Sequence, residues 1–142
     1  MKTLLLISAL LAVLAVGALA DAPQPLTDFQ KTLRAASKDN KLAFILLGRP
    51  TCSICNGTKA MIKEGKIAVT SADYVMGDLN VDDPRTQAAF LQKYKANFGD
   101  TLPFVVVTDS HGKMLASSGG YKDAAQWNAL LAEAKGKAAP KP

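Results

Sequence analysis

The sequence has few of the residues that bind metals or haem. Among its 142 residues there are only two cysteines, Cys52 and Cys55, and one histidine, His111. A structural zinc site needs four such ligands, so we do not expect the cysteine pair to be half of one. Covalent haem attachment needs a histidine directly after the second cysteine, where this chain has Asn56. We therefore expect no metal and no other cofactor, and we expect His111 to be a solvated turn residue rather than a catalytic one.

Aromatic residues and charge clusters are also scarce. Aromatic side chains make up 6% of the sequence, and the formal net charge is +5. The lysines are scattered rather than clustered with aromatic residues, which is typical of a solvated surface. We therefore expect no nucleic-acid partner.

The longest hydrophobic run lies at the N-terminus. A basic residue precedes apolar residues 4–16, and the small residues Ala18 and Ala20 follow them. This order is typical of a secretory signal peptide that is cleaved before Asp21. An uncleaved membrane anchor is the alternative, because residues 4–20 are almost long enough to span a bilayer. The small residues favour cleavage, so we predict a signal peptide over residues 1–20 and an exported protein, periplasmic or secreted.

Removing 20 of the 142 residues leaves 122, enough for one domain with a sizeable core and too few for two. Apolar spacing, caps and turn residues predict that helices and strands alternate along this domain. After an extended leader at 21–26, the predicted elements are a helix at 29–39, a strand at 42–47, a helix through 56–63, a strand at 74–81, a helix from Pro84, strands at 102–108 and 113–116 that form a hairpin, and a helix at about 122–135. We predict that the tail, residues 136–142, is disordered.

The two cysteines lie between a predicted buried strand and a predicted helix. Two residues separate them, so their sulfurs can meet across the first turn of the helix and close a disulfide. With Cys52 near the helix start, unpaired backbone N–H groups and the positive end of the macrodipole favour its thiolate. Cys52 is therefore the expected nucleophile. A structural disulfide is the alternative, because exported proteins often use cysteines in this way, although so short a loop gives little entropic stabilisation.

The order of the elements resembles the thioredoxin-like family over about residues 27–135. The resemblance rests on a CxxC pair that follows a buried strand, and on Leu102-Pro103 before a hairpin and a final helix. It implies an α/β fold with a central mixed sheet flanked by helices. It also implies that the Leu102–Pro103 peptide bond is cis and lies beside the cysteines, where Leu102, Pro103, Pro50 and Thr51 would contact substrate. The alternative is an ordinary trans proline at the start of an edge strand.

The sequence departs from thioredoxins at several positions. Thioredoxins have Trp-Cys-Gly-Pro-Cys, whereas here Thr51 replaces the tryptophan, and Ser53 and Ile54 replace Gly-Pro. Leu46 stands where thioredoxins typically have a buried aspartate that assists proton transfer. Because the residues between the cysteines strongly influence the reduction potential, the direction of electron flow stays open.

Asp78 is a candidate replacement for that aspartate. When residues 78–82 are aligned with the thioredoxin pattern Lys-Leu-Asn-Ile-Asp, Asp78 takes the place of the buried lysine that faces the aspartate. If its side chain points beneath the cysteine helix, desolvation would favour its protonated form and Asp78 could accept the Cys55 proton. The alternative is a solvated aspartate near a strand end, and the two-residue period of a strand does not decide between them.

The resemblance implies a thiol-disulfide oxidoreductase that acts on protein cysteines. Cys52 would attack a protein disulfide, or react with a protein dithiol in the opposite direction, and Cys55 would resolve the mixed disulfide. An exported dithiol stays reduced only when electrons are supplied to it, so a membrane electron donor is a candidate partner. We expect a monomer. The alternative function is a non-catalytic thioredoxin-like binding module in which the cysteines form a static disulfide.

Overall fold

The computed structural model describes residues 21–94 and 101–138. The predicted signal peptide, residues 1–20, and the last four residues of the predicted tail lie outside the described residues. Within the described part of the chain, no helix is both long enough and apolar enough to cross a membrane.

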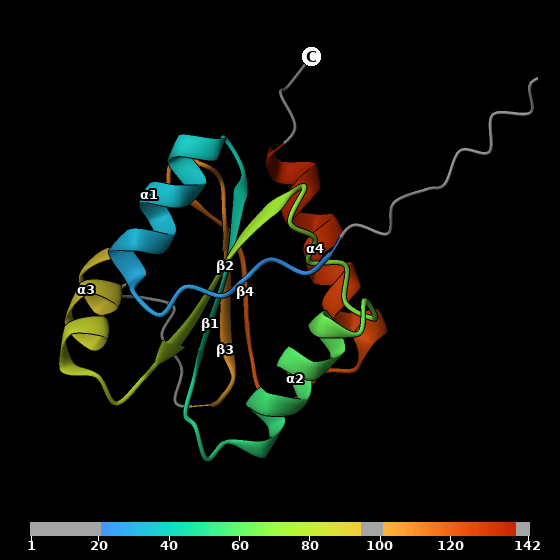
Figure 1. Ribbon diagram of the computed structural model, residues 1–142, viewed down its shortest axis with the longest axis horizontal. Helices are drawn as coiled ribbons and strands as arrows, with labels where there is room; N and C mark the ends of the chain where they lie inside the picture. Colours follow the sequence, from blue (N-terminus) through green and yellow to red (C-terminus); the bar gives the residue numbers. More distant parts are fainter. Residues whose placement is uncertain (1–20, 95–100, 139–142) are drawn as a thin grey trace, which may run out of the picture.

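A four-stranded mixed sheet forms the centre of the domain, and helices cover both of its faces (Figure 1). The strand order is β2-β1-β3-β4, with β1 parallel to β2 and antiparallel to β3, and with β4 antiparallel to β3. Helices α1 and α3 cover one face, and α2 and α4 cover the other. The predicted α/β arrangement is therefore confirmed. The elements are α1 (Phe29–Asp39), β1 (Leu42–Gly48), α2 (Ser53–Lys63), β2 (Tyr74–Asn80), α3 (Pro84–Tyr94), β3 (Phe104–Thr108), β4 (Met114–Gly119) and α4 (Ala124–Ala138).

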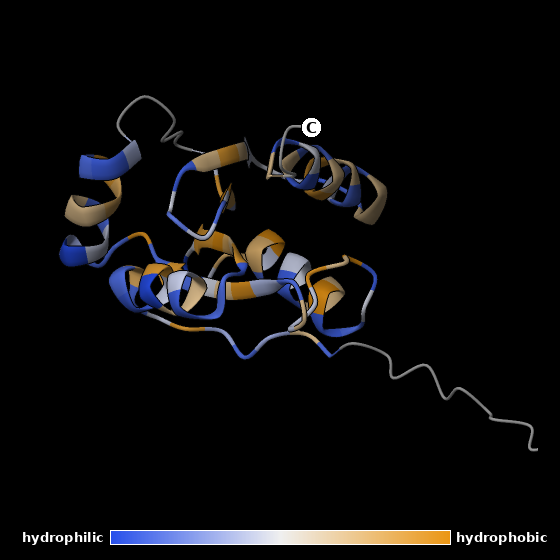
Figure 2. Ribbon diagram, turned by 90° about the horizontal axis from the view of Figure 1, so that it is seen from above, coloured by the Kyte–Doolittle hydropathy of each residue, from blue (hydrophilic) through white to orange (hydrophobic). Residues whose placement is uncertain are grey.

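The central strand β1 is buried on both faces, which explains its continuous apolar sequence. The neighbouring strand β2 alternates between the two cores. Tyr74 and Met76 join the core beneath α2 and α4, whereas Val75 and Leu79 join the core beneath α1 and α3. In Figure 2 the helices carry hydrophilic residues together with hydrophobic ones, as expected when one side of each helix packs on a sheet. The alternation places Asp78 on the α2 side of the sheet.

The helix ends are capped by side chains that the sequence places at them. Asp28 is the N-cap of α1, where its carboxylate accepts a hydrogen bond from Lys31 N at 2.7 Å. Asn40 ends the same helix in the left-handed conformation, with φ of 50°. Asp123 precedes α4 and exchanges two hydrogen bonds with Gln126, one from each backbone N–H to the other side chain.

Several predicted boundaries need correction. β3 begins at Phe104 rather than 102, and β4 continues to Gly119 rather than ending at 116. Helix α4 begins at Ala124 and continues to Ala138, so residues 136–138 are helical, and the prediction of a disordered tail is wrong for them. The last turn is held by Lys137, whose Nζ donates to Leu115 O at 2.9 Å and contacts Glu133 Oε1 at 2.6 Å. The first of these contacts is tertiary, so local composition did not indicate it.

The leader, residues 21–26, crosses the front of β2 in Figure 1, and its last residue, Leu26, pairs with the free edge of that strand. Leu26 N donates to Met76 O at 2.9 Å, and Leu26 O accepts from Asp78 N at 2.8 Å. At the start of the leader, Ser71 N donates to Asp21 O at 2.8 Å. The two bonds of Leu26 satisfy backbone groups of β2 that an edge strand would otherwise leave open to pairing with another chain.

Candidate functional site

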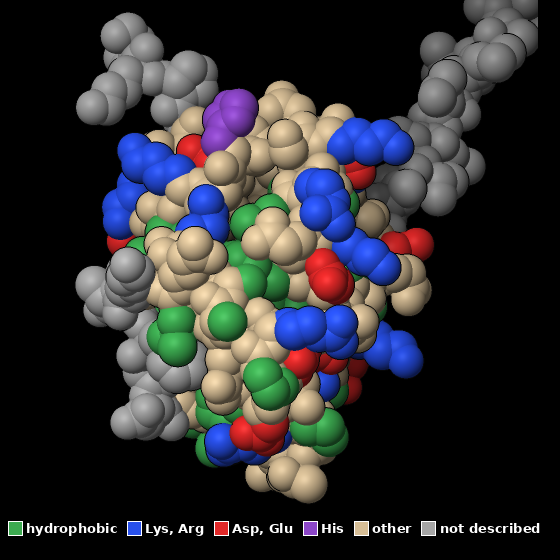
Figure 3. Space-filling view, turned by 90° about the vertical axis from the view of Figure 1, so that its left-hand side faces the viewer, with side chains coloured by type: hydrophobic (Ala, Val, Ile, Leu, Met, Phe, Trp, Pro, Cys, Tyr) green, Lys and Arg blue, Asp and Glu red, His purple; other side chains and the backbone are tan. Residues whose placement is uncertain are grey.

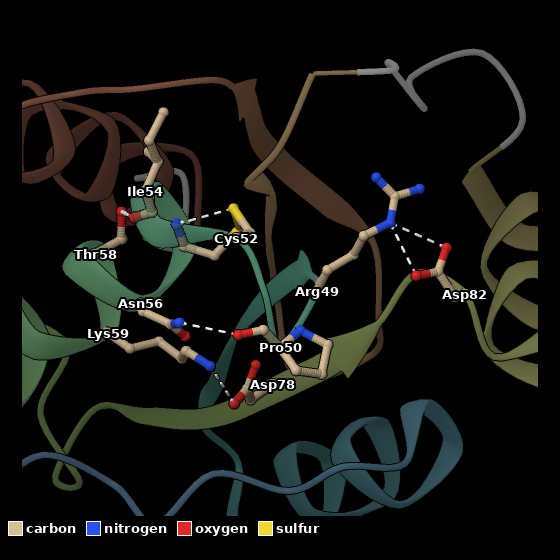
Figure 4. The surroundings of a disulfide bond; sticks show 10 residues. Arg49, Pro50, Cys52, Ile54, Asn56, Thr58, Lys59, Asp78 and Asp82 are labelled. Carbon is tan, nitrogen blue, oxygen red and sulfur yellow. Dashed lines mark hydrogen bonds and ion pairs between the residues drawn. A yellow bond between two sulfur atoms is a disulfide. The ribbon is translucent and has the colours of Figure 1, made fainter.

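Cys52 and Cys55 form a disulfide at the start of α2 (Figure 4). Their Cα atoms are 5.3 Å apart. A short turn follows strand β1, and Cys52 is the N-cap residue of α2. The predicted order of a strand, a turn and a helix that carries the cysteines is confirmed.

The two sulfurs have different surroundings. Cys55 is completely buried, whereas Cys52 is partly exposed. The backbone N–H of Cys55 donates to Cys52 Sγ at 3.1 Å, so a donor of the first helical turn is directed at the Cys52 sulfur. In the dithiol form this donor and the helix dipole would stabilise a thiolate at Cys52. The geometry therefore leaves the Cys52 sulfur accessible to solvent and the Cys55 sulfur protected from it.

Polar contacts hold the turn that precedes the disulfide. Arg49 Nε lies 3.0 and 2.9 Å from the two carboxylate oxygens of Asp82, and Cys52 N donates to Arg49 O at 3.1 Å. The hydrogen bond and the charge of Asp82 raise the pKa of Arg49. Asn56 Nδ2 donates to Pro50 O at 3.1 Å, which ties the turn to the first turn of α2. Pro50 itself is exposed beside the disulfide.

Asp78 lies beneath α2 and forms an ion pair with a residue of that helix. Lys59 Nζ is 3.0 Å from Asp78 Oδ2, and the two side chains are 29% and 27% exposed. Both residues line a cavity of about 270 Å³ that also reaches Gly48 and Pro50, next to the cysteine turn. Figure 4 shows the pair below Pro50, on the side of the turn opposite Ile54. The sequence did not identify Lys59 as the partner of Asp78.

The segment that precedes β3 also lies at this end of the sheet. The peptide bond between Leu102 and Pro103 is cis. Pro103 is buried and its carbonyl accepts from Gly120 N at 2.9 Å. Leu102 is partly buried and packs against both cores, including the one that contains Cys55.

An apolar groove runs along the exposed side of α2. It has a volume of about 340 Å³ and is lined by Ser53, Ile54, Gly57, Thr58, Met61 and Tyr121. Ile54 is 41% exposed and Tyr121 is 70% exposed, so two large apolar side chains face solvent close to the disulfide. Ile54 lies between the cysteines, whereas Tyr121 follows β4. Tyr121 could not be predicted from the sequence as part of the site, because only the fold brings it to α2.

For the described residues outside this end of the sheet, the sequence predicts binding of neither metal nor nucleic acid. Across residues 21–94 and 101–138 there is no group of three or more His, Cys, Asp or Glu side chains that could hold a metal ion. His111 is exposed in the turn between β3 and β4, where its backbone N–H donates to Asp109 Oδ1 at 2.9 Å. On the face formed by α1 and α3, basic and acidic side chains are interspersed (Figure 3).

Comparison with known proteins shows similarity of structure rather than of sequence. No protein-family model matches the chain, and no curated protein matches its sequence. A mutant thioredoxin from Halobacterium salinarum NRC-1 superposes with a TM-score of 0.61 at 17% identity, covering 87% of this chain and 96% of that one. The germline-specific thioredoxin Deadhead from Drosophila melanogaster gives 0.57 at 21% identity, covering 79% and 96%. A DsbH oxidoreductase gives 0.55 at 20% identity, covering 82% and 87%.

The chain has a thioredoxin-like fold. The structure brings together, at one end of this fold, most residues that the sequence singled out. Cys52 and Cys55 are bonded, Pro50 and Thr51 are exposed in the turn before them, and Asp78 lies under α2. The thioredoxin-like fold thus places the disulfide between two different surroundings. One is a cavity lined by the Lys59–Asp78 ion pair, and the other is the apolar groove beside Ile54.

Proposed function

We propose that the protein is an exported thiol-disulfide oxidoreductase that acts on cysteines of other proteins. One observation carries this proposal: a disulfide at the N-terminus of a helix joins a partly exposed sulfur to a fully buried one. This asymmetry suits a nucleophile and a resolving thiol, because substrate can reach Cys52 but not Cys55. Support for export comes from the signal-peptide pattern of residues 1–20.

In the reducing direction, the Cys52 thiolate attacks one sulfur of a substrate disulfide. The substrate bond breaks, a mixed disulfide forms through Cys52, and the first substrate sulfur leaves as a thiolate. The Cys55 thiolate then attacks Cys52 Sγ and releases the second substrate sulfur. Two electrons pass to the substrate, and the protein is left with the Cys52–Cys55 disulfide. The same steps in reverse oxidise a substrate dithiol.

Asp78 is the proposed proton acceptor for Cys55 during resolution. The Cys55 thiol is buried and must lose its proton before it attacks. Asp78 and Gly48 line the same cavity, and Gly48 is adjacent to the Cys55 sulfur. The cavity of about 270 Å³ has room for water, and Lys59 and Asp78 in its lining can bind water, so we propose that the proton passes from Cys55 past Gly48 to Asp78 by way of a water molecule. The ion pair with Lys59 holds the carboxylate beneath α2.

The proposed substrate surface surrounds the exposed edge of the disulfide. We assign to it Pro50 and Thr51 from the exposed turn, together with the partly buried Leu102 and the backbone of the buried Pro103 from the segment before β3. On the other side, the apolar groove beside Ile54 would take an apolar side chain of the substrate polypeptide close to its reactive cysteine. The groove suits this occupant because the two side chains that dominate it, Ile54 and Tyr121, are apolar and exposed.

The partners follow from the chemistry. In the reducing direction the dithiol is oxidised to the disulfide in each catalytic cycle. The protein would then need another molecule to reduce it again, and a membrane electron donor is the proposed source. The substrates are protein disulfides or dithiols. We propose that the protein acts as a monomer, because one chain supplies both cysteines and the surfaces around them.

Equilibration with glutathione tests this function. The chain without residues 1–20 is incubated in buffers of defined ratio of reduced to oxidised glutathione, and the dithiol fraction is read by alkylation and mass spectrometry. We expect half of the protein to be in the dithiol form at a potential within the physiological range. We also expect the dithiol form to reduce a protein disulfide such as those of insulin. A disulfide that stays closed at all these potentials would instead support a static binding module. Sequencing of the exported protein, expected to begin at Asp21, tests export separately.

A further inference from the structure

The last residue of β1, Gly48, lies against the buried sulfur of the disulfide. A Cβ atom built on Gly48 would be 2.8 Å from Cys55 Sγ and 3.0 Å from Cys55 Cβ. It would also be 3.3 Å from Leu46 Cδ2. Separations below 3.0 Å are essentially never seen for real Cβ atoms, so a side chain at this position would force a neighbour to shift. Gly48, Leu46 and Cys55 are all buried, which leaves little room for that shift.

Backbone conformation does not explain the glycine. Among the described residues, the glycines with positive φ are Gly65, Gly112 and Gly120, and Gly48 is not one of them. Gly48 continues the regular pairing of β1 with β2, where its Cα partner is Asn80. The Gly48 carbonyl accepts a hydrogen bond from Val81 N at 2.9 Å. Any L-residue can adopt the backbone conformation of such a strand. Glycine is therefore required here for the space that it leaves next to Cys55 Sγ, not for its backbone freedom.

We propose that Gly48 is a positioning residue for the redox couple. Because Gly48 has no side chain, Cys55 Sγ can occupy the position from which it bonds to Cys52. The free space at residue 48 therefore stabilises the disulfide relative to the dithiol. The inference rests on the proposed function, because it concerns the same pair of cysteines. It adds a residue that determines the balance between the oxidised and reduced forms.

The direction of the effect follows from the freedom of the sulfur. In the disulfide, the bond to Cys52 fixes Cys55 Sγ at 2.8 Å from the position of the added Cβ atom. In the dithiol, Cys55 Sγ can rotate about its Cα–Cβ bond and move away from Gly48. A methyl group on residue 48 therefore destabilises the disulfide more than the dithiol. Leu46 and Cys55 Cβ are crowded in both forms and contribute little to the difference.

The test compares Gly48→Ala with Gly136→Ala, which adds the same methyl group on α4, where nothing outside its own stretch of helix lies within 4 Å. Each protein is equilibrated in the reaction protein disulfide + 2 glutathione ⇌ protein dithiol + glutathione disulfide. We expect the equilibrium constant of Gly48→Ala to shift about tenfold toward the dithiol. The constant of Gly136→Ala should stay within about twofold of wild type, since its methyl group has no neighbour to displace. A folded Gly48→Ala protein with the wild-type constant would overturn the proposal, and so would an equal shift in Gly136→Ala.

Two further measurements cover the cases in which glutathione does not reduce the disulfide or Gly48→Ala does not fold. If glutathione leaves the wild-type disulfide intact, the proposed function fails, but dithiothreitol can replace glutathione and the two alanine variants can still be compared. If Gly48→Ala does not fold, the double variant Gly48→Ala/Cys55→Ala removes the sulfur that the methyl group would meet. We expect the double variant to fold. A double variant that also fails to fold would show that the sulfur is not what excludes a side chain, and would overturn the proposal.

Discussion

Asp78 on β2 is paired with Leu46 on the adjacent strand β1, and the two side chains have different surroundings beneath α2. Leu46 is completely buried in the core, whereas Asp78 is 27% exposed and lies 3.0 Å from Lys59 Nζ. An apolar residue on β1 thus stands beside a carboxylate on β2, one strand away from where thioredoxins typically have theirs. The cavity at this position, together with the partial exposure of Asp78, gives the carboxylate access to water. Asp78 is therefore the carboxylate that we propose for proton transfer at this site.

We predict that Asp78→Asn slows the resolution step by about 100-fold and changes its pH profile, because the amide cannot accept the Cys55 proton. The first attack by Cys52 should keep its wild-type rate. Stopped-flow measurement of mixed-disulfide formation and decay separates the two steps. Asp73→Asn is the matched control, since Asp73 also pairs with a lysine, Lys135, at 2.7 Å but precedes the other end of β2. A wild-type rate of resolution in Asp78→Asn at every pH would leave Asp78 without a catalytic role.

We predict that the two cysteines behave differently in the reduced protein. Iodoacetamide should modify Cys52 before Cys55, because Cys52 is partly exposed and receives a helix N–H, whereas Cys55 is buried. A Cys55→Ser variant should accumulate mixed disulfides with substrate proteins, since nothing resolves them. Peptide mapping and non-reducing gels measure these two outcomes. Cys52→Ser is the control and should trap none, so equal trapping by both variants would refute the assignment of roles.

We predict that Tyr121→Ser raises KM for a peptide disulfide by about tenfold with little change in kcat, because an apolar contact made equally in the ground and transition states is lost. The effect should be largest for peptides with a large apolar residue next to cysteine. Leu91→Ser is the matched control: Leu91 is also an exposed large hydrophobic residue, at 40%, but it lies on α3, across the sheet from α2. Equal changes in KM for both variants would mean that the groove does not bind substrate.

The fold and the cysteine turn could be predicted because local signals determine them. The apolar run of β1 and the CxxC spacing each lie within about ten consecutive residues, where periodicity and helix-start rules apply. The polar surroundings could not be predicted in the same way. The pairing of Lys59 with Asp78 depends on which face of β2 packs under α2, and this is set by the β1–β2 register. A period of two along a strand gives two faces without saying which is inner.

Other contacts of the site join residues that are far apart in the chain. Tyr121 meets α2 only because the β3–β4 hairpin returns to the end of the sheet where the disulfide lies. The need for glycine at position 48 depends on the distance to a sulfur seven residues later, across a turn whose shape the sequence does not specify. A glycine at the end of an otherwise apolar strand, directly before the cysteine turn, was the available signal. It indicates a close approach without indicating to which atom.

The leader contacts the domain through backbone hydrogen bonds at both of its ends, and Leu26 pairs with the edge of β2, so we predict that removal of the leader destabilises the protein. A chain that begins at Thr27 lacks the hydrogen bonds from Leu26 N to Met76 O, from Asp78 N to Leu26 O and from Ser71 N to Asp21 O. At roughly 1 kcal/mol for each bond, we expect its free energy of unfolding to fall by about 3 kcal/mol relative to a chain that begins at Asp21. Urea denaturation followed by circular dichroism measures the difference.

The shortened chain should also associate through the uncovered edge of β2, because unpaired backbone groups can pair with a second copy. Light scattering at increasing protein concentration detects this association. Gln24→Ala in the longer chain is the control, since it changes an exposed side chain of the leader and keeps the backbone that covers the strand. Equal stability of the two chain lengths would mean that the leader only rests on the domain. A loss in the shortened chain but not in Gln24→Ala would show that backbone pairing along β2 stabilises the strand that carries Asp78.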